Sequence, residues 1–232
     1  MVNLSAFAAI VFDAYGTVFD VYAVEALLES RFPGRGRAIA LRWRDKQIEY
    51  SRLRTMSGRY ADFWSVTVDA LEYACEFQGV LLDDEARSRL LAAYERLPPH
   101  AEVRDALRAL VARGHTLAVL SNANRAMLEA ALMAAGLRPL FEHVLSVESV
   151  RKFKTAREAY QLGPDAFGRP ASELLFVSSN GRDVAGAAWF AYPSYWINRA
   201  GAPLERLDAA PIAKGRTMTD LVDFLAQLRT PH

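Results

Sequence analysis

Short, uninterrupted runs of apolar residues that end in small polar or acidic residues recur along the chain. The runs at Ala9–Asp13, Thr116–Asn122 and Leu174–Asn180 are rich in branched and aromatic side chains. Continuous apolar runs of this length are typical of strands that are buried on both faces of a parallel sheet. The same reasoning predicts a shorter strand at Val144–Val147 and a further one at Phe190–Ile197.

Segments with helical periodicity separate the later strands. The apolar residues of the first such segment lie on one stripe, which Gly114 ends: Val103, Leu107, Leu110 and Val111. Asn124 is expected to cap a second helix that runs to Gly136, and Thr219–Leu228 is expected to close the chain as a third. This alternation of strands and helices predicts an α/β fold with a Rossmann-like parallel sheet.

The region from residue 21 to residue 97 follows a different pattern, because its segments have helical periodicity and none has the pattern of a strand. The predicted helices are Ala23–Phe32, Arg37–Arg54, Asp62–Gln78 and Asp83–Leu97. Pro98 and Pro99 mark the return to the sheet. We therefore expect a helical cap domain at 21–97, inserted into an α/β core domain formed by 1–20 and 98–232.

Polar side chains stand where the predicted strands end. In an open parallel sheet, ligands bind at the carboxyl ends of the strands. The residues placed there are Asp13, Thr17, Ser121, Asn122, Ser178, Asn180 and Asp183. An acid at the tip of a buried strand loses hydration and needs donors around it, so a functional role is favoured for Asp13. Ser121 and Asn122 could instead simply turn the chain, and Asp183 could serve as an acid in the first turn of a helix.

Cations near these strand ends are the next candidates. Lys154 follows the predicted short strand, where it could reach the carboxylates and bind a substrate anion, whereas Lys152 is expected to be solvated. One helix of the cap carries four arginines, most of which should be surface charges: Arg42, Arg44, Arg52 and Arg54. An arginine on the face that also carries Ile48 could close over the cleft.

Composition narrows the classes of function. The 28 basic and 27 acidic residues leave a formal charge of +1, so no global field favours nucleic acid or an anionic membrane. The single cysteine, Cys75, cannot form an intrachain disulfide, and no zinc-ligand spacing occurs. The first residues lack the basic region of a signal peptide, and no apolar run approaches membrane length. A cytoplasmic location is expected.

Four motifs together resemble the haloacid dehalogenase (HAD) superfamily, and most closely its L-2-haloacid dehalogenases. They are "FDAYGT" at Phe12–Thr17, "WRDKQIEYSRLR" at Trp43–Arg54, "LSNAN" at Leu120–Asn124 and "FVSSNGRDVAGA" at Phe176–Ala187. The resemblance covers nearly the whole chain. It implies a HAD-like core, and it accounts for a helical cap just after the first strand.

Tyr15 separates two activities within that superfamily. The phosphotransferases of the superfamily resemble one another in an Asp-x-Asp motif after the first strand, and the second aspartate acts as acid and base toward the leaving group. In this chain the same three positions are Asp13, Ala14 and Tyr15. A halide needs no proton to leave, so an acid there would serve no purpose. A monoanionic carboxylate can also be held without the divalent cation that phosphoryl transfer usually needs. No metal or other cofactor is expected.

The resemblance implies hydrolysis of (S)-2-haloalkanoic acids with inversion, through a covalent ester on Asp13. It implies that Arg44 receives the halide and that Ser121, with Asn122 nearby, binds the substrate carboxylate. Lys154 would steady Asp13. The remaining implied site residues position or activate water (Asp183, Ser178, Asn180), complete the polar shell (Thr17, Tyr160), or bind or surround the substrate (Ala14, Tyr15, Ile48, Phe63).

Two positions depart from the pattern of this resemblance. Arg182 stands where an apolar residue is frequent, and Thr155 follows Lys154 where proline is usual. Two alternatives stay open: a phosphatase of a small metabolite, which Tyr15 disfavours, and a noncatalytic carboxylate-binding protein. A homodimer is expected because the family usually pairs. The apolar stretch "DFWSVTVDALEYACEF" could serve that interface or the core of the cap.

Overall fold

The computed structural model describes residues 7–228. Within these residues the sheet has six parallel strands in the order β3-β2-β1-β4-β5-β6. Their bounds are β1 Ala9–Phe12, β2 Leu117–Ser121, β3 His143–Ser146, β4 Leu174–Ser178, β5 Ser194–Ile197 and β6 Ala213–Gly215. Every residue of β1, β2 and β4 is buried, as expected for central strands covered on both faces. The predicted parallel α/β sheet is confirmed.

The register of the three central strands brings their polar ends together. Phe12 pairs with Val119 of β2 on one side and with Val177 of β4 on the other. The next amide, that of Asp13, donates to the carbonyl of Val177 at 2.8 Å. The residues that follow all three strands therefore meet at one edge of the sheet.

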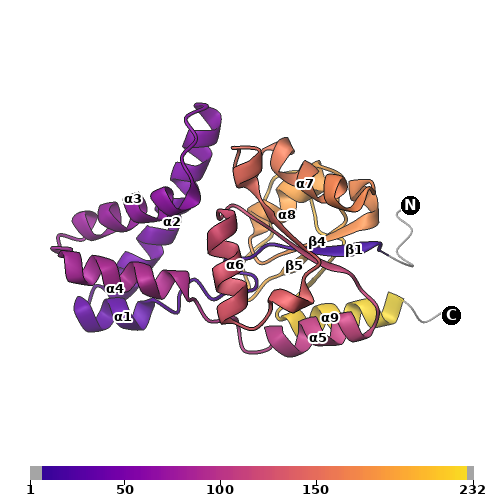
Figure 1. Cartoon of the computed structure of the whole chain (residues 1–232), viewed down its shortest axis with the longest axis horizontal. Coiled ribbons are helices and arrows are strands. Elements are labelled where there is room, and N and C mark those ends of the chain that lie inside the picture. The colour runs from indigo at the N-terminus through magenta and orange to yellow at the C-terminus, as the bar shows by residue number, and fades with distance from the viewer. Residues whose placement is uncertain (1–6, 229–232) are drawn as a thin grey trace.

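In the described part of the chain, five helices flank the sheet: α5 Val103–Ala112, α6 Arg125–Ala134, α7 Arg157–Phe167, α8 Gly181–Trp189 and α9 Met218–Leu228. Figure 1 shows α5 and α9 side by side along one face of the sheet, with α7 and α8 beyond the other. Asn124 caps α6, as predicted, by accepting a hydrogen bond from the amide of Met127 at 2.9 Å. Short 3₁₀ turns occur at Arg138–Leu140, Val147–Ser149 and Ala171–Glu173.

The other helices form a group to one side of the sheet (Figure 1). They are α1 Glu25–Arg31, α2 Gly36–Met56, α3 Phe63–Phe77 and α4 Asp84–Glu95. The chain enters and leaves this group at one place, where the amide of Asp20 donates to the carbonyl of Pro98 at 2.9 Å. All four helices fall inside the range expected for the cap, whose boundaries stay a prediction. Among residues 7–228, no helix is long and apolar enough to cross a membrane.

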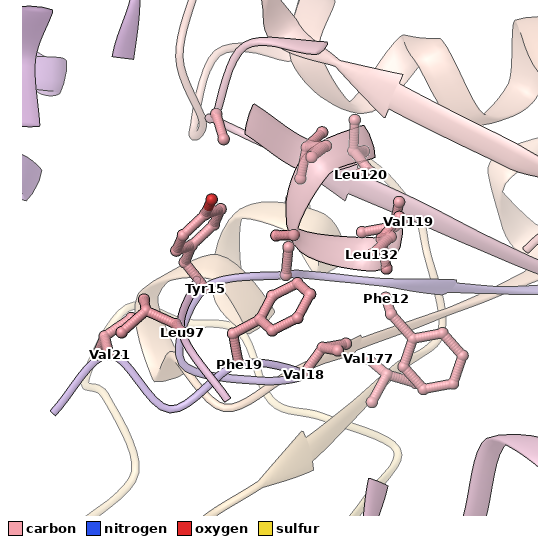
Figure 2. Close-up of a cluster of buried hydrophobic side chains, with 14 of the residues drawn as sticks. Phe12, Tyr15, Val18, Phe19, Val21, Leu97, Val119, Leu120, Leu132 and Val177 are labelled. Carbon is pink, nitrogen blue, oxygen red and sulfur yellow. The ribbon is translucent and has the colours of Figure 1, made fainter. Parts of the chain in front are cut away.

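A continuous apolar core joins the sheet to this crossing point. Figure 2 shows Phe12 and Val177 at one end of a buried cluster and Tyr15, Val21 and Leu97 at the other. Burying a large apolar side chain contributes about 1.5–3 kcal/mol to folding. The segment that carries Tyr15 is therefore fixed by packing against the core.

Several elements differ from the expectations. β5 begins at Ser194 because Phe190 still bonds to the last turn of α8, and because Pro193 has no amide hydrogen. Val147 belongs to a 3₁₀ turn that follows β3. Val111, expected on the buried stripe of α5, is 40% exposed. The elements β6 and α7 had no predicted counterpart.

Candidate active site

The carboxylate of Asp13 lies just after β1 and is surrounded by donors from its own turn and from two other segments. Its Oδ2 accepts hydrogen bonds from the hydroxyl of Thr17 at 2.9 Å and from the amide of Asn180 at 3.1 Å. The hydroxyl of Ser178 lies at 3.5 Å, where a hydrogen bond is weak. Its Oδ1 faces the ammonium of Lys154 at 3.2 Å. The carboxylate is thus fixed at both of its oxygens.

The turn after β1 is locked onto the loop after β4. The hydroxyl of Thr17 accepts from the amide of Ser179 at 2.8 Å, while the hydroxyl of Ser179 donates to the carbonyl of Gly16 at 2.7 Å. Gly16 has a φ of +96°, a conformation that favours glycine because it has no Cβ. This turn directs Thr17 back toward Asp13.

Lys154 lies between two carboxylates. Its ammonium is 3.2 Å from Asp13 and 3.0 Å from Asp183, and its own amide donates to Oδ1 of Asn122 at 2.8 Å. Burial disfavours the charged ammonium, but the two carboxylates outweigh burial and raise the pKa of Lys154. Thr155 in place of proline therefore does not displace this lysine from the carboxylates.

Asp183 lies in the first turn of α8. Its Oδ1 accepts from the hydroxyl of Tyr160 at 2.7 Å, and its Oδ2 faces Lys154. Burial raises the pKa of the Asp183 carboxyl, Lys154 opposes that effect, and Asp13 adds to it; the net pKa is raised. Burial also raises the pKa of Tyr160 well above its ordinary value, so this phenol stays a neutral donor. A carboxylate with a raised pKa is a stronger base.

Helix α2 supplies the opposite wall of the cleft. Arg44, Ile48, Ser51 and Arg52 share one face of the helix through their spacing, and all four line the cavity that holds Asp13. The Arg44 guanidinium donates to the carbonyl of Tyr15 at 3.0 Å. This contact links α2 directly to the turn after β1.

A buried glutamine supports Arg44. Gln47 is 1% exposed, and its Oε1 lies 3.5 Å from Nη1 of Arg44 and accepts from the hydroxyl of Tyr94 at 3.3 Å. Its amide donates to the hydroxyl of Thr67 at 3.0 Å. Sequence reasoning did not single out Gln47, although its position three residues after Arg44 places it one turn along the helix.

Three other basic side chains that the sequence analysis considered do not line the cavity. Arg42 stacks over the ring of Phe77 at 4.2 Å, and Arg54 forms an ion pair with Asp69 at 3.1 Å. Lys152 is exposed to solvent, as predicted, and pairs with Glu158. Of the four arginines on α2, the cleft therefore receives Arg44 and Arg52.

Tyr15 forms an aromatic wall beside Asp13. Its ring stacks on Tyr94, with centroids 5.6 Å apart, and contacts Phe63 at 6.2 Å. Tyr15 is 3% exposed, and its hydroxyl has no hydrogen-bond partner among the described residues. Burial, followed by the proximity of Tyr94, raises its pKa. Tyr15 therefore offers no ionisable acid next to Asp13 near neutral pH.

The cavity at this edge of the sheet has a volume of about 70 Å³, several times the roughly 10–15 Å³ that one water needs. A small organic acid fits that scale. The residues that line the cavity are Asp13, Tyr15, Arg44, Ile48, Ser51, Arg52, Phe63, Ser121, Asn122, Lys154, Thr155, Asn180, Arg182 and Asp183.

Not every predicted site residue reaches the cavity. Thr17, Ser178 and Tyr160 are fully buried behind it and act on Asp13 or Asp183 through hydrogen bonds. Ala14 is also fully buried, and it does not line the cavity, although it was expected to bind substrate. Its carbonyl accepts the amides of Val18 and Phe19 within the turn.

Four residues that line the cavity were not predicted as site residues: Ser51, Arg52, Thr155 and Arg182. The spacing of Ser51 and Arg52 from Arg44 on one helix could have identified both.

Within residues 7–228, no three His, Cys, Asp or Glu side chains gather as a metal site would require. Cys75 of α3 is buried and forms no disulfide, and burial raises its pKa to about 11.

Comparison with known proteins identifies relatives along most of the chain. A family model described as haloacid dehalogenase-like hydrolase matches residues 7–190. The (S)-2-haloacid dehalogenase of Pseudomonas sp. (strain YL) is 46% identical over 202 residues, which is 87% of each chain. Haloacetate dehalogenase H-2 of Moraxella sp. (strain B) is 42% identical and covers 94% of this chain and 97% of its own.

Solved structures agree with these relatives. The L-2-haloacid dehalogenase from Xanthobacter autotrophicus, with chloropropionic acid covalently bound, has a TM-score of 0.88 at 37% identity and covers 95% of this chain and 98% of its own. Another crystal structure of an L-2-haloacid dehalogenase has a TM-score of 0.94 at 49% identity, covering 95% and 99% of the two chains. The chain therefore belongs to the haloacid dehalogenase-like hydrolase family, where its relatives include (S)-2-haloacid dehalogenases.

Proposed function

We propose that this chain hydrolyses short (S)-2-haloalkanoic acids to (R)-2-hydroxyalkanoic acids. The observation that carries the proposal is the setting of Asp13: a fixed carboxylate faces a small cavity between a buried lysine and an aromatic wall. Tyr15 occupies the position at which a phosphotransferase would need a second carboxylate. The names of the relatives support the same activity.

In the first step, Oδ of Asp13 attacks C2 of the substrate from the side opposite the halogen. A C–O bond forms, the carbon–halogen bond breaks, and the halide leaves with the electron pair, so C2 is inverted. Arg44, on the facing wall, is assigned to the departing halide. Ser121 and Asn122, at the end of β2, are assigned to the substrate carboxylate.

In the second step, water attacks the carboxyl carbon of the Asp13 ester. Asp183 takes the proton of that water, and its raised pKa suits it to the task. The ester C–O bond breaks, Asp183 returns its proton to the departing alkoxide, and the second proton of the water leaves Asp13 to solvent, which restores the Asp13 carboxylate. Because C2 is not attacked again, the inversion is retained. Ser178 and Asn180 are assigned to positioning this water.

We also propose three properties of the whole molecule. Residues 21–97 form a cap domain over a core of residues 1–20 and 98–232, and the protein acts in the cytoplasm as a homodimer. Most apolar side chains of α3 are buried, as in a cap core. Exposed apolar side chains of the cap remain available for an interface: Leu41, Leu53, Phe77 and Leu81. Light scattering of the purified protein tests the dimer.

The activity is tested by chloride release from each enantiomer of 2-chloropropionate, measured with the purified protein in excess chelator. Release from the (S) form alone supports the proposal and its metal independence. Release that requires added Mg²⁺, or release from the (R) form, contradicts it. A folded sample that releases no chloride from either form shifts weight to the phosphatase or the noncatalytic binding protein.

A further inference from the structure

Two arginines at the cleft have no assigned role in the reaction. Arg52 on α2 and Arg182 in the first turn of α8 both line the cavity that contains Asp13. Arg182 also lines the adjoining, wider cavity, which places it where the two spaces meet. Within residues 7–228, neither guanidinium forms a hydrogen bond or an ion pair. Two guanidiniums without a hydrogen-bonded partner therefore line one cavity, from α2 and from α8.

The charges that line the cavity do not balance. The ionisable groups are the two carboxylates of Asp13 and Asp183 and the four cations Arg44, Arg52, Lys154 and Arg182. The cations thus exceed the anions by two. A monocarboxylate substrate supplies one negative charge. When Asp13 becomes an ester it loses its own negative charge and the released halide carries one, so the total charge in the cavity does not change. Among the side chains that line this cavity, one positive charge then remains, which the second carboxylate of a dicarboxylate would offset; Glu205 lies outside it, in the adjoining cavity.

The excess charge is concentrated at Arg52 and Arg182. Burial lowers the pKa of Arg52 first, and the nearby charge of Arg182 lowers it further. Glu205 and, after it, Tyr160 oppose this effect, and the side chain of Glu205 lies beside Gly181 in the adjoining cavity. Two guanidiniums near one carboxylate leave one positive charge, which an anion bound between α2 and α8 would neutralise.

We infer that Arg52 and Arg182 form a second anion subsite, which receives the distal carboxylate of a 2-halodicarboxylic acid. The inference rests on the proposed function, because the reaction at C2 is the same. A guanidinium matches the two oxygens of a carboxylate with paired donors. Arg44, Ser121 and Asn122 keep their assignments to the halide and to the carboxylate next to C2.

The test compares two substrates of equal chain length: (S)-2-chlorosuccinate and (S)-2-chlorobutyrate, in which a methyl group replaces the distal carboxylate. Chloride release gives kcat/KM for the wild type, Arg52→Gln and Arg182→Gln. Each variant is expected to lose about tenfold in kcat/KM for chlorosuccinate, as for loss of a hydrogen bond between charged groups. For chlorobutyrate, which lacks the distal carboxylate, both variants should lose clearly less in kcat/KM than for chlorosuccinate.

Two further variants act as controls. Arg54→Gln removes the same charge two residues along α2, outside the cavity, and should leave the ratio of the two kcat/KM values unchanged. Glu205→Gln removes the opposing charge and should raise that ratio in favour of chlorosuccinate.

The outcomes separate this inference from the proposed function. Wild type that dechlorinates chlorobutyrate but not chlorosuccinate overturns the inference and leaves the function standing. An equal loss for both substrates in Arg52→Gln and Arg182→Gln means that these arginines only attract anions of any kind, which also overturns it. No chloride from either substrate overturns the proposed function, and the inference falls with it.

Discussion

The ammonium of Lys154 lies 3.2 Å from Oδ1 of Asp13, and the same nitrogen lies 3.0 Å from Asp183. None of these three side chains is more than 10% exposed. A single buried cation therefore holds together the proposed nucleophile and the proposed base. It fixes the relative placement of two carboxylates that would otherwise repel each other.

Lys154→Met should lower the free energy of unfolding by about 3 kcal/mol near neutral pH, because it leaves two buried carboxylates without their cation. The pKa of Lys154 is raised, so its stabilising contribution is complete below the ordinary lysine pKa and is lost as the pH rises through the raised value. Because burial raises the pKa of the Asp183 carboxyl, its protonation at acid pH should shrink the difference between variant and wild type.

Urea denaturation at neutral and acid pH measures this effect. The matched control is Lys152→Met, because Lys152 is exposed and paired with Glu158. The control should change stability by no more than about 0.5 kcal/mol. Equal effects of the two substitutions would contradict the account of Lys154.

Asp183→Asn should allow the first step and block the second, because an amide cannot accept the proton of the attacking water. We expect the ester to accumulate, visible as a mass increment on the peptide that contains Asp13. The double variant Asp13→Asn with Asp183→Asn should show no increment. Normal turnover by Asp183→Asn would remove Asp183 from the role of base.

The acid limb of the pH profile should report Asp183. Burial raises the pKa of its carboxyl, and the base must be deprotonated to act. The rate of ester hydrolysis should therefore fall with decreasing pH at a pKa above the ordinary aspartate value. Single-turnover rates across the pH range measure it, and an acid limb at or below the ordinary value would contradict the assignment.

Sequence alone predicted the features that follow from strong patterns. The runs that became β1, β2 and β4 are apolar throughout, so their burial in a parallel sheet follows directly. The short strand Ala213–Gly215 has no apolar run, since it lies at the sheet edge and none of its residues is buried. The helix Arg157–Phe167 contains Pro164, a residue that weakens a helical pattern.

In the site, too, some features follow from local sequence patterns and others depend on how the helices pack. Residues at strand ends, such as Asp13 and Asp183, could be placed together because parallel strands end at one edge. The contribution of Arg52 depends on how α2 is oriented over the sheet, which no local pattern gives. The support of Arg44 by Gln47 depends likewise on the packing of α3 and α4 around that glutamine.

Arg44→Gln should lower kcat by about 10²–10³-fold, because it removes an oriented cation from the developing halide charge. The neighbouring substitution Arg42→Gln lies on the same helix but loses only a contact with Phe77, so it should leave kcat unchanged. Initial rates of chloride release measure both. A loss of less than about tenfold in Arg44→Gln would assign the halide to another group.

The central claim is that Asp13 forms the covalent ester, and a single turnover in ¹⁸O-labelled water tests it most directly. Enzyme in excess over (S)-2-chloropropionate is quenched after one turnover, and the product and the peptide containing Asp13 are weighed by mass spectrometry. The account predicts ¹⁸O in the Asp13 carboxylate and unlabelled hydroxyl in the product. Label in the product with none in Asp13 would mean that water attacks C2 directly, and would contradict the account.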